Sequence, residues 1–304
     1  MPFPISDNFT TIYDSDPRSW LQGPIIAANK DCDLEVWGTA FLIAEGWAMT
    51  AKHVIKDYLA SIGGIDFSRG GSIKSNFSFL IRLTMTDTEG KPVSFAATQI
   101  YYAGTDIALL RVQIQDGKTW ASLADFPTLQ LLPPKVGESI AVVGCPHSYL
   151  NHTHDNVREV HLYPRLSTGV VRDVHEMSRD RNLNFPCFHM SARVLGRMSG
   201  SPIFNSKGYI CGVAVYSMQQ DETLEPISYG ATLWPTAGIG CDKEPPVVGD
   251  SATFFDVMRR GQIKVTDLDQ VIVAKYRGKR QVINLPIAAK AGWTPEGNVI
   301  AVRT

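Results

Sequence analysis

From residue 24 to residue 233 the chain consists largely of short segments rich in Val, Ile, Thr and aromatic residues. Residues of these types favour strands, and the Gly, Pro, Asn and Asp residues between the segments favour turns. The 25 glycines and 18 prolines fit a chain with many turns. A long run of strands with few helices indicates a β-sandwich or β-barrels. The expected strands are roughly 24–28, 34–44, 47–50, 77–84, 93–103, 107–112, 139–145, 165–174, 187–192, 201–205, 209–217 and 227–233.

Two short helices are expected beside these strands. The first begins at Ala51 and carries His53 to about residue 59. The second covers 252–260, where the preceding Asp250-Ser251 supplies a cap and Gly261 ends the helix.

Two hairpins and an irregular N-terminal segment complete this description. The turn signal 205–208 (Asn-Ser-Lys-Gly) joins two apolar runs, so 201–217 is predicted to be a hairpin. Residues 271–276 and 281–285 predict another hairpin near the C-terminus. Residues 1–22 are turn-rich, with a single helical turn expected near 17–20.

Composition excludes several classes of protein. With 304 residues and 44% hydrophobic residues, the chain has material for a packed core, so disorder is excluded for the chain as a whole. The net charge of −1 argues against a nucleic-acid partner. No apolar run approaches the roughly 18 residues of a membrane span, and residues 1–7 lack a basic leader. We therefore expect a cytoplasmic protein with no membrane partner.

The five cysteines are odd in number and show no close-paired spacing. This usage is typical of reduced, buried thiols in a reducing compartment. The five are Cys32, Cys145, Cys187, Cys211 and Cys241.

Three separated segments carry residue types with catalytic chemistry. In the first, 38–55, a His follows a strand at the start of a helical turn. In the second, 103–112, an Asp directly precedes an apolar strand. In the third, 196–204, a Ser lies in a turn of small residues that leads into a hairpin. The candidate residues are His53, Asp106 and Ser199, in that order.

These segments resemble the trypsin-like (chymotrypsin-fold) serine proteases, and more closely the compact bacterial branch that includes the high-temperature-requirement proteases. The family pattern Thr-Ala-x-His-Val matches 50–54, and Asp-Ile-Ala-Leu-Leu matches 106–110. The pattern x-Ser-Gly-Gly/Ser-Pro matches 198–202, and 212–217 looks like the family's substrate-binding strand. The resemblance covers about residues 24–260.

The resemblance implies a catalytic triad. A Ser hydroxyl is a poor nucleophile unless an adjacent imidazole takes its proton, and the imidazole needs a carboxylate to orient it. Ser199 is then the nucleophile, His53 the general base and Asp106 the orienting group. The backbone N–H groups of Arg197 and Ser199 are expected to stabilise the oxyanion.

Other readings of these residues stay open on the sequence alone. His53 could be structural, Asp106 could cap a turn, and Ser199 could be an ordinary turn residue. Ser201 is a rival nucleophile, although it aligns with the family's second Gly. Cys145 is a possible thiol nucleophile but lies outside the family's nucleophile turn.

The sequence departs from the family at three places. Arg197 stands where the family usually has Gly, and a Cβ resists some backbone conformations, so we expect an oxyanion hole that is complete only with substrate or a partner. Val54 replaces the Cys that secreted relatives carry beside the catalytic His, in agreement with reduced cysteines. The Ile-Val-Gly-Gly activation sequence of digestive proteases is missing.

Specificity depends on residues that the resemblance identifies less firmly. Arg193 lies six residues before the nucleophile, where the base of the primary pocket is often formed, and a cation there favours an acidic substrate side chain. His189 could face the same pocket or lie in the core. The substrate-binding strand contributes Val215, Tyr216 and Ser217.

Two further groups of residues invite a ligand but have simpler readings. His147, His152, His154, His161 and Asp155 crowd one loop and could bind a metal, but a loop beside the substrate cleft is the preferred reading. Lys275, Arg277, Lys279 and Arg280 form a basic hairpin that is read as a solvated turn.

The sequence thus predicts an all-β fold of two antiparallel six-stranded β-barrels with a short C-terminal helix and a C-terminal hairpin. Residues 1–23 form an arm, 24–261 the protease domain (barrels at about 24–125 and 126–261) and 262–304 an extension. The predicted function is a serine endopeptidase without cofactor or metal that acts on protein or peptide substrates. It is expected to be narrow in specificity and regulated by an activating or target protein. The alternative is a catalytically silent binding module on the same fold.

Overall fold

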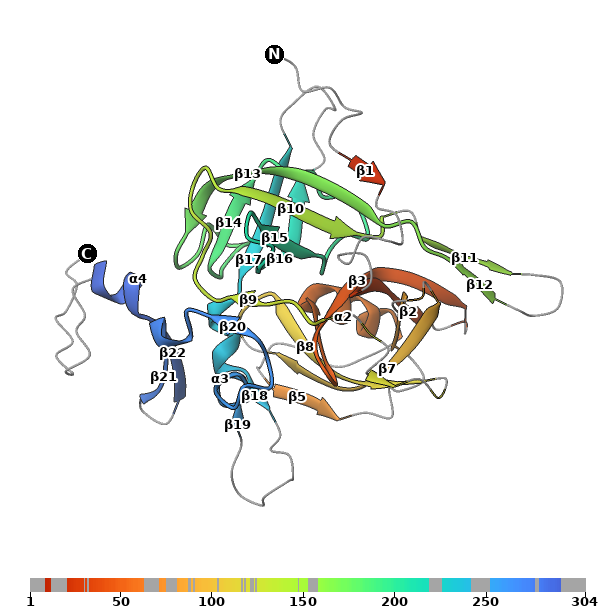
Figure 1. Cartoon of the computed structure of the whole chain (residues 1–304), viewed down its shortest axis with the longest axis horizontal. Helices are drawn as coiled ribbons and strands as arrows, with labels where there is room; N and C mark the ends of the chain where they lie inside the picture. The colour runs from red at the N-terminus through yellow and green to blue at the C-terminus, as the bar shows by residue number, and fades with distance from the viewer. Residues whose placement is uncertain are drawn as a thin grey trace, which may run out of the picture.

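The structure, a computed structural model, contains two β-barrels stacked one above the other, with the C-terminal elements along one side (Figure 1). It describes residues 9–11, 21–29, 31, 33–62, 71–74, 81–86, 89, 91–102, 104–115, 117, 119–120, 123, 125–146, 148–152, 158–218, 226–241, 252–276 and 279–290.

The first barrel closes through six antiparallel strands in the order β2-β3-β4-β8-β7-β6, because β6 pairs back onto β2. A further strand, β5 (Gly71–Lys74), adds to β7. The six strands are β2 (Gln22–Ala28), β3 (Leu34–Ala44), β4 (Trp47–Ala51), β6 (Ile81–Thr86), β7 (Pro92–Tyr102) and β8 (Ile107–Ile114).

The second barrel closes in the same way, in the order β10-β13-β14-β17-β16-β15, because β15 pairs with β10. Its strands are β10 (Ser139–Gly144), β13 (Arg165–His175), β14 (Cys187–Met190), β15 (Pro202–Asn205), β16 (Ile210–Met218) and β17 (Ile227–Thr232). The predicted fold class of two antiparallel six-stranded barrels is therefore confirmed.

Each barrel encloses side chains that alternate inward along its strands. In the second barrel Ile140 and Val142 of β10 belong to one buried cluster with Phe188 and Met190 of β14. A larger cluster begins inside the first barrel and continues between the barrels, for example through Val213 of β16. This continuous core fixes how the two barrels face each other.

Helices and additional strands cover the barrels. The two predicted helices are confirmed with shifted ends, as α2 (Lys52–Ser61) and α3 (Phe254–Arg259). The predicted C-terminal hairpin is β21 (Val271–Tyr276) with β22 (Lys279–Asn284). Further elements are η3 (Trp234–Gly238), β18 (Gly240–Cys241), β19 (Ala252–Thr253), η4 (Leu268–Gln270) and α4 (Leu285–Lys290).

Several elements differ from the sequence-based expectations. The strand expected at 77–84 is β6, while 75–80 and the turn expected at 17–20 lie outside the described residues. The histidine-rich segment read as a loop is partly a two-stranded ribbon, β11 (Tyr149–His152) with β12 (Arg158–His161). The cap of α3 is Thr253, not Asp250-Ser251, because Thr253 and Asp256 exchange hydrogen bonds.

Three short strands extend the sheet of the second barrel, and two of them come from near the chain ends. The segment expected to be irregular contains β1 (Phe9–Thr11), which pairs with β13. Near the other end, β20 (Val265–Thr266) runs parallel to β9 (Leu129–Gln130). Ile263 and Val271 also belong to the large core cluster. The division of the chain at residues 23 and 261 stays a prediction.

Candidate active site

The helix that carries His53 starts directly where β4 ends. Ala51 precedes α2 in extended conformation and offers no side-chain cap. The first N–H groups of a helix need acceptors, and Asp106 supplies them. The backbone N–H of Lys52 donates to the Asp106 carbonyl (3.0 Å), and that of His53 donates to Asp106 Oδ1 (3.0 Å). Asp106 therefore fixes the start of α2 from the turn before β8.

The same carboxylate holds the His53 ring. His53 Nδ1 lies 2.7 Å from Asp106 Oδ2, the distance of a charge-assisted hydrogen bond. The His53 side chain is 31% exposed and that of Asp106 14%. A carboxylate that accepts from Nδ1–H leaves Nε2 as the ring's basic nitrogen.

The environment of His53 raises its pKa above the ordinary value of 6.5. Burial alone lowers the pKa of His53, because it disfavours the charged ring. The hydrogen bond and charge of Asp106, with a smaller effect of Asp57, outweigh this. The ring thus takes up a proton more readily than a free imidazole.

The turn that carries Ser199 is held against the first barrel. The Thr39 N–H of β3 donates to the Ser199 carbonyl (2.9 Å), and the Gly200 N–H donates to the Ala214 carbonyl (2.7 Å). Gly200 has φ +89°, and a Cβ there would lie 2.0 Å from the Thr39 carbonyl oxygen. Glycine is therefore required at 200 by both conformation and space.

Gly38 shows that the Ser199 turn and the His53 helix are neighbours. A Cβ at Gly38 would lie 2.8 Å from the Val54 side chain and 2.9 Å from the Ser199 carbonyl oxygen. Val54 directly follows His53 in α2. The structure thus brings His53, Asp106 and the Ser199 backbone to one place where the barrels meet.

Arg197 adopts the left-handed conformation, with φ +69°. For a residue with a Cβ this costs about 1–2 kcal/mol. Its carbonyl accepts a hydrogen bond from Thr39 Oγ1 (2.9 Å), and its Nη1 donates to the Ser148 carbonyl (3.1 Å). The Cβ therefore does not prevent Arg197 from taking this conformation. Within the described residues, the backbone N–H groups of Arg197 and Ser199 donate to no acceptor.

The expected substrate-binding strand is the end of β16. Val215 is buried, whereas Tyr216 is exposed. Tyr216 pairs across the ladder with Tyr229 of β17, which sequence reasoning missed. The signal that could have identified Tyr229 is the register of the β16–β17 hairpin, since that register sets which residue faces Tyr216.

Tyr229 is the centre of an aromatic group. The His189 ring stacks on it at 5.3 Å between centroids, and Arg179 Cζ lies 4.6 Å above it. His189 is partly buried on β14. Arg193 is also partly buried, its N–H donates to Ser167 Oγ (2.8 Å), and its Nε has no acceptor among the described residues. Contacts between Arg193 and the Ser199 turn stay a prediction, as does the role of Ser217.

The rival nucleophiles lie in buried surroundings. Ser201 is fully buried, in the turn that leads into β15. Burial raises the pKa of the Cys145 thiol to about 12, against smaller lowering effects of Ser148 and Gln22. A thiol with so high a pKa is protonated at neutral pH and is a poor nucleophile.

The histidine-rich ribbon offers no metal site in the part of the chain that the structure describes. His161 stacks on Tyr149 with 4.7 Å between ring centroids. His147, His154 and Asp155 lie outside the described residues, as do Arg277 and Cys32. The described helices include none that is long and apolar enough to cross a membrane.

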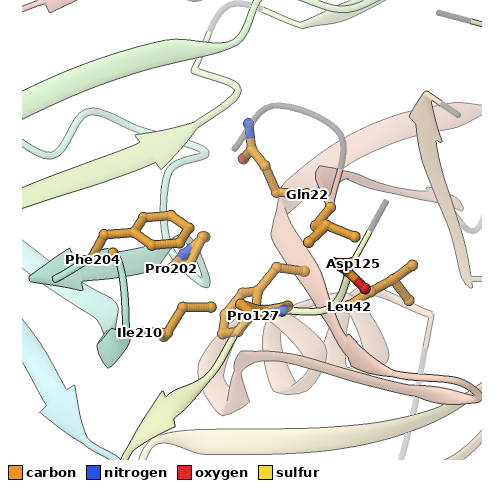
Figure 2. A pocket seen from close by; sticks show the side chains of 10 residues that line it. Gln22, Leu42, Asp125, Pro127, Pro202, Phe204 and Ile210 are labelled. Carbon is orange, nitrogen blue, oxygen red and sulfur yellow. The ribbon is translucent and has the colours of Figure 1, made fainter. Parts of the chain in front are cut away.

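A pocket of about 150 Å³ lies between the barrels (Figure 2). Its wall is mostly apolar, and none of the candidate catalytic residues lines it. In the close view the amide of Gln22 points away from Pro127 and Leu42 (Figure 2). The residues around it are Leu21, Gln22, Phe41, Leu42, Asp125, Pro127, Pro202, Phe204, Gly208 and Ile210.

One family model and several solved structures match the chain. No curated protein matches the chain. One similar solved structure is the crystal structure of Deg5, which is 19% identical and aligns over 70% of this chain and 84% of that chain with a TM-score of 0.44. The model of the family described as "Trypsin-like peptidase domain" matches residues 38–213. That match spans more than half of the chain and all three segments that carry the candidate residues.

Proposed function

The chain belongs to the trypsin-like peptidase family, and from this premise we propose that it is a serine endopeptidase. Family membership supports a serine protease acting on protein or peptide substrates. The observation that carries the proposal is the His53–Asp106 pair, 2.7 Å apart, beside the turn of Ser199. This combination serves the activation of a serine hydroxyl.

The proposed reaction has two steps. Ser199 Oγ attacks the scissile carbonyl while His53 Nε2 takes its proton, and Asp106 stabilises the imidazolium that forms. His53 then gives the proton to the leaving amine, and an acyl-enzyme remains on Ser199. A water molecule, activated by His53 as base, releases the acid product. The proposed oxyanion donors are the N–H groups of Arg197 and Ser199.

The proposed substrate contacts lie on the second barrel. An extended peptide adds to the edge formed by Val215, Tyr216 and Ser217 through main-chain hydrogen bonds. Arg193 is the proposed pocket residue, and its cation favours an acidic side chain before the scissile bond. The exposed Tyr216 ring supports a contact with substrate. We also propose narrow specificity and regulation by a partner protein.

A reducing location is part of the same proposal. Cys145, Cys187 and Cys211 are free thiols in the structure, and all three are buried, as is Cys241. Such cysteines are typical of cytosolic proteins. We therefore propose that the protein acts in the cytoplasm.

Labelling with a fluorophosphonate probe tests the proposed activity. The native protein, alone and with candidate partners, is expected to label at Ser199, located by mass spectrometry. Ser199→Ala is expected to lose the label. The matched control is Ser201→Ala, which removes a buried hydroxyl two residues away and is expected to keep it.

The competing function is a catalytically silent binding module, and the observation that favours it is Arg197 in place of the family's Gly. Native protein that never labels under any of these conditions would overturn the proposed activity and leave the binding module as the remaining function. Activity retained in Ser199→Ala would instead indicate a different nucleophile.

A further inference from the structure

Arg197 is held at two points that belong to different parts of the molecule. Thr39 Oγ1 of β3 donates to its carbonyl at 2.9 Å. Its guanidinium Nη1 donates to the Ser148 carbonyl at 3.1 Å, across a separation of 49 residues. Both bonds act on a residue with φ +69°. The turn before Ser199 is thus clamped from the first barrel and from the segment before β11.

The two bonds to Arg197 matter because they act on a backbone in the left-handed conformation. Glycine takes positive φ without cost, whereas a residue with a Cβ prefers negative φ. Rotation about the N–Cα bond turns the preceding peptide plane, and with it the Arg197 N–H. Loss of the left-handed conformation therefore redirects a proposed oxyanion donor without moving His53 or Asp106.

The segment that accepts from Arg197 is itself firmly held. Ser148 is fully buried. Its N–H donates to the Cys145 carbonyl (3.4 Å), and its Oγ accepts from the Tyr163 N–H (3.2 Å). The Cys145 N–H donates to Thr39 Oγ1 (3.4 Å), the hydroxyl that also holds Arg197. These bonds make Ser148 a fixed support for the guanidinium.

We propose that the Arg197 side chain is a positioning residue: by binding the Ser148 carbonyl it holds the turn in the left-handed conformation that aims the Arg197 N–H at the oxyanion. The proposal rests on the proposed function of Ser199. It differs from a role in substrate recognition, in which the exposed guanidinium would attract a charged group. It also ties the site to the β11–β12 ribbon, because Ser148 directly precedes β11.

Glycine substitution separates conformation from charge. Arg197→Ala removes the anchor and keeps the Cβ, so the rate constant for labelling Ser199 with an uncharged fluorophosphonate is expected to fall about tenfold. Arg197→Gly also removes the anchor but permits positive φ, so its rate constant is expected to stay within about threefold of native. The matched control is Arg260→Ala, which removes an exposed guanidinium at the end of α3 and is expected to label at the native rate.

Crystal structures of the same variants give a readout that does not depend on labelling. The φ of residue 197 is expected to be positive in the native protein and in Arg197→Gly, and negative in Arg197→Ala. Equal labelling by Ala and Gly variants, or a positive φ in Arg197→Ala, overturns the positioning role. If native protein does not label at all, the proposed function fails, while the φ values still decide whether the side chain holds the turn.

Discussion

At the scale of single residues, the two carboxylate oxygens of Asp106 bind the backbone and the side chain of the same residue, His53. Oδ1 accepts from the His53 N–H at the start of α2, and Oδ2 binds the ring of the same residue. The helix start and the imidazole orientation are therefore set by one side chain. Because the charged ring is favoured, this pair stabilises the folded state fully below about pH 6.5, and the contribution is lost as pH rises through the raised pKa of His53.

Asp106→Asn is expected to lower the rate of acylation by about 1,000-fold or more. It should also shift the acid limb of the pH–rate profile to lower pH, because burial then dominates and lowers the pKa of His53. The pH dependence of phosphonate labelling measures both effects. Asp57→Asn is the matched control: it removes a smaller charge effect on His53, so a slight shift of the limb with a near-native maximum is expected. An unmoved limb in Asp106→Asn contradicts the assignment.

Gly200 and Gly208 provide a second test at this scale. Both have positive φ, but a Cβ at 200 meets the Thr39 carbonyl at 2.0 Å, whereas a Cβ at 208 meets nothing within 4 Å. Gly200→Ala should therefore reduce the free energy of unfolding by about 3 kcal/mol or more. Gly208→Ala should cost about 1 kcal/mol, from conformation alone. Urea unfolding distinguishes them, and equal losses would refute the steric argument.

At the scale of elements, α3 depends on a capping box. Thr253 Oγ1 accepts from the Asp256 N–H, and Asp256 Oδ2 accepts from the Thr253 N–H (2.8 Å). Burial raises the pKa of Asp256, but these hydrogen bonds and the charges of Arg259 and Arg260 outweigh it and leave the pKa below 3.8. The carboxylate therefore contributes to stability above about pH 4, and this contribution is lost as pH falls through the lowered pKa.

Thr253→Ala is expected to lower the free energy of unfolding by about 1 kcal/mol at neutral pH. Thr253→Ser keeps the hydroxyl and should stay within about 0.5 kcal/mol of native. Thermal or urea unfolding of the two variants measures the difference. A serine variant as unstable as the alanine variant would show that the threonine methyl, not the cap, matters.

The sequence predicted long elements better than short ones. Strands such as β3, β7 and β13 have enough β-branched and aromatic residues for local propensity to identify them. The strand β1 has three residues, and β9 and β20 have two each. Segments this short form strands only because a partner strand lies beside them. The same holds for the candidate site. Local motifs identify His53, Asp106 and Ser199. Tyr229, by contrast, comes to lie beside Tyr216 only through folding, and so does Ser148 beside Arg197.

At the scale of the whole molecule, Cys145, Cys187 and Cys211 are buried in or beside strands of the second barrel. Burial raises the pKa of Cys145 to about 12 and that of Cys187 to about 11, and it also raises the pKa of Cys211. Lowering effects of neighbouring groups, such as Arg179 at Cys187, are smaller. These thiols are therefore protonated and shielded from reagents in the folded protein.

Iodoacetamide is expected to leave Cys145, Cys187 and Cys211 unmodified in native protein and to alkylate all three in urea. Mass spectrometry of the digested protein identifies the modified sites. Phosphonate labelling of Ser199 should survive the treatment unchanged. Rapid alkylation of Cys145 with loss of labelling would contradict both its burial and the serine mechanism.

The 2.9 Å bond between the Thr39 N–H and the Ser199 carbonyl crosses from one closed barrel to the other. A separation of about one ångström carries this bond beyond hydrogen-bond range, yet it leaves every strand ladder within each barrel intact. The geometry at Ser199 is therefore set partly by contacts between the barrels and not only by the strand ladders within each of them. The position of the Ser199 turn therefore depends on how closely the two barrels pack, and any change at their junction acts directly on the candidate nucleophile.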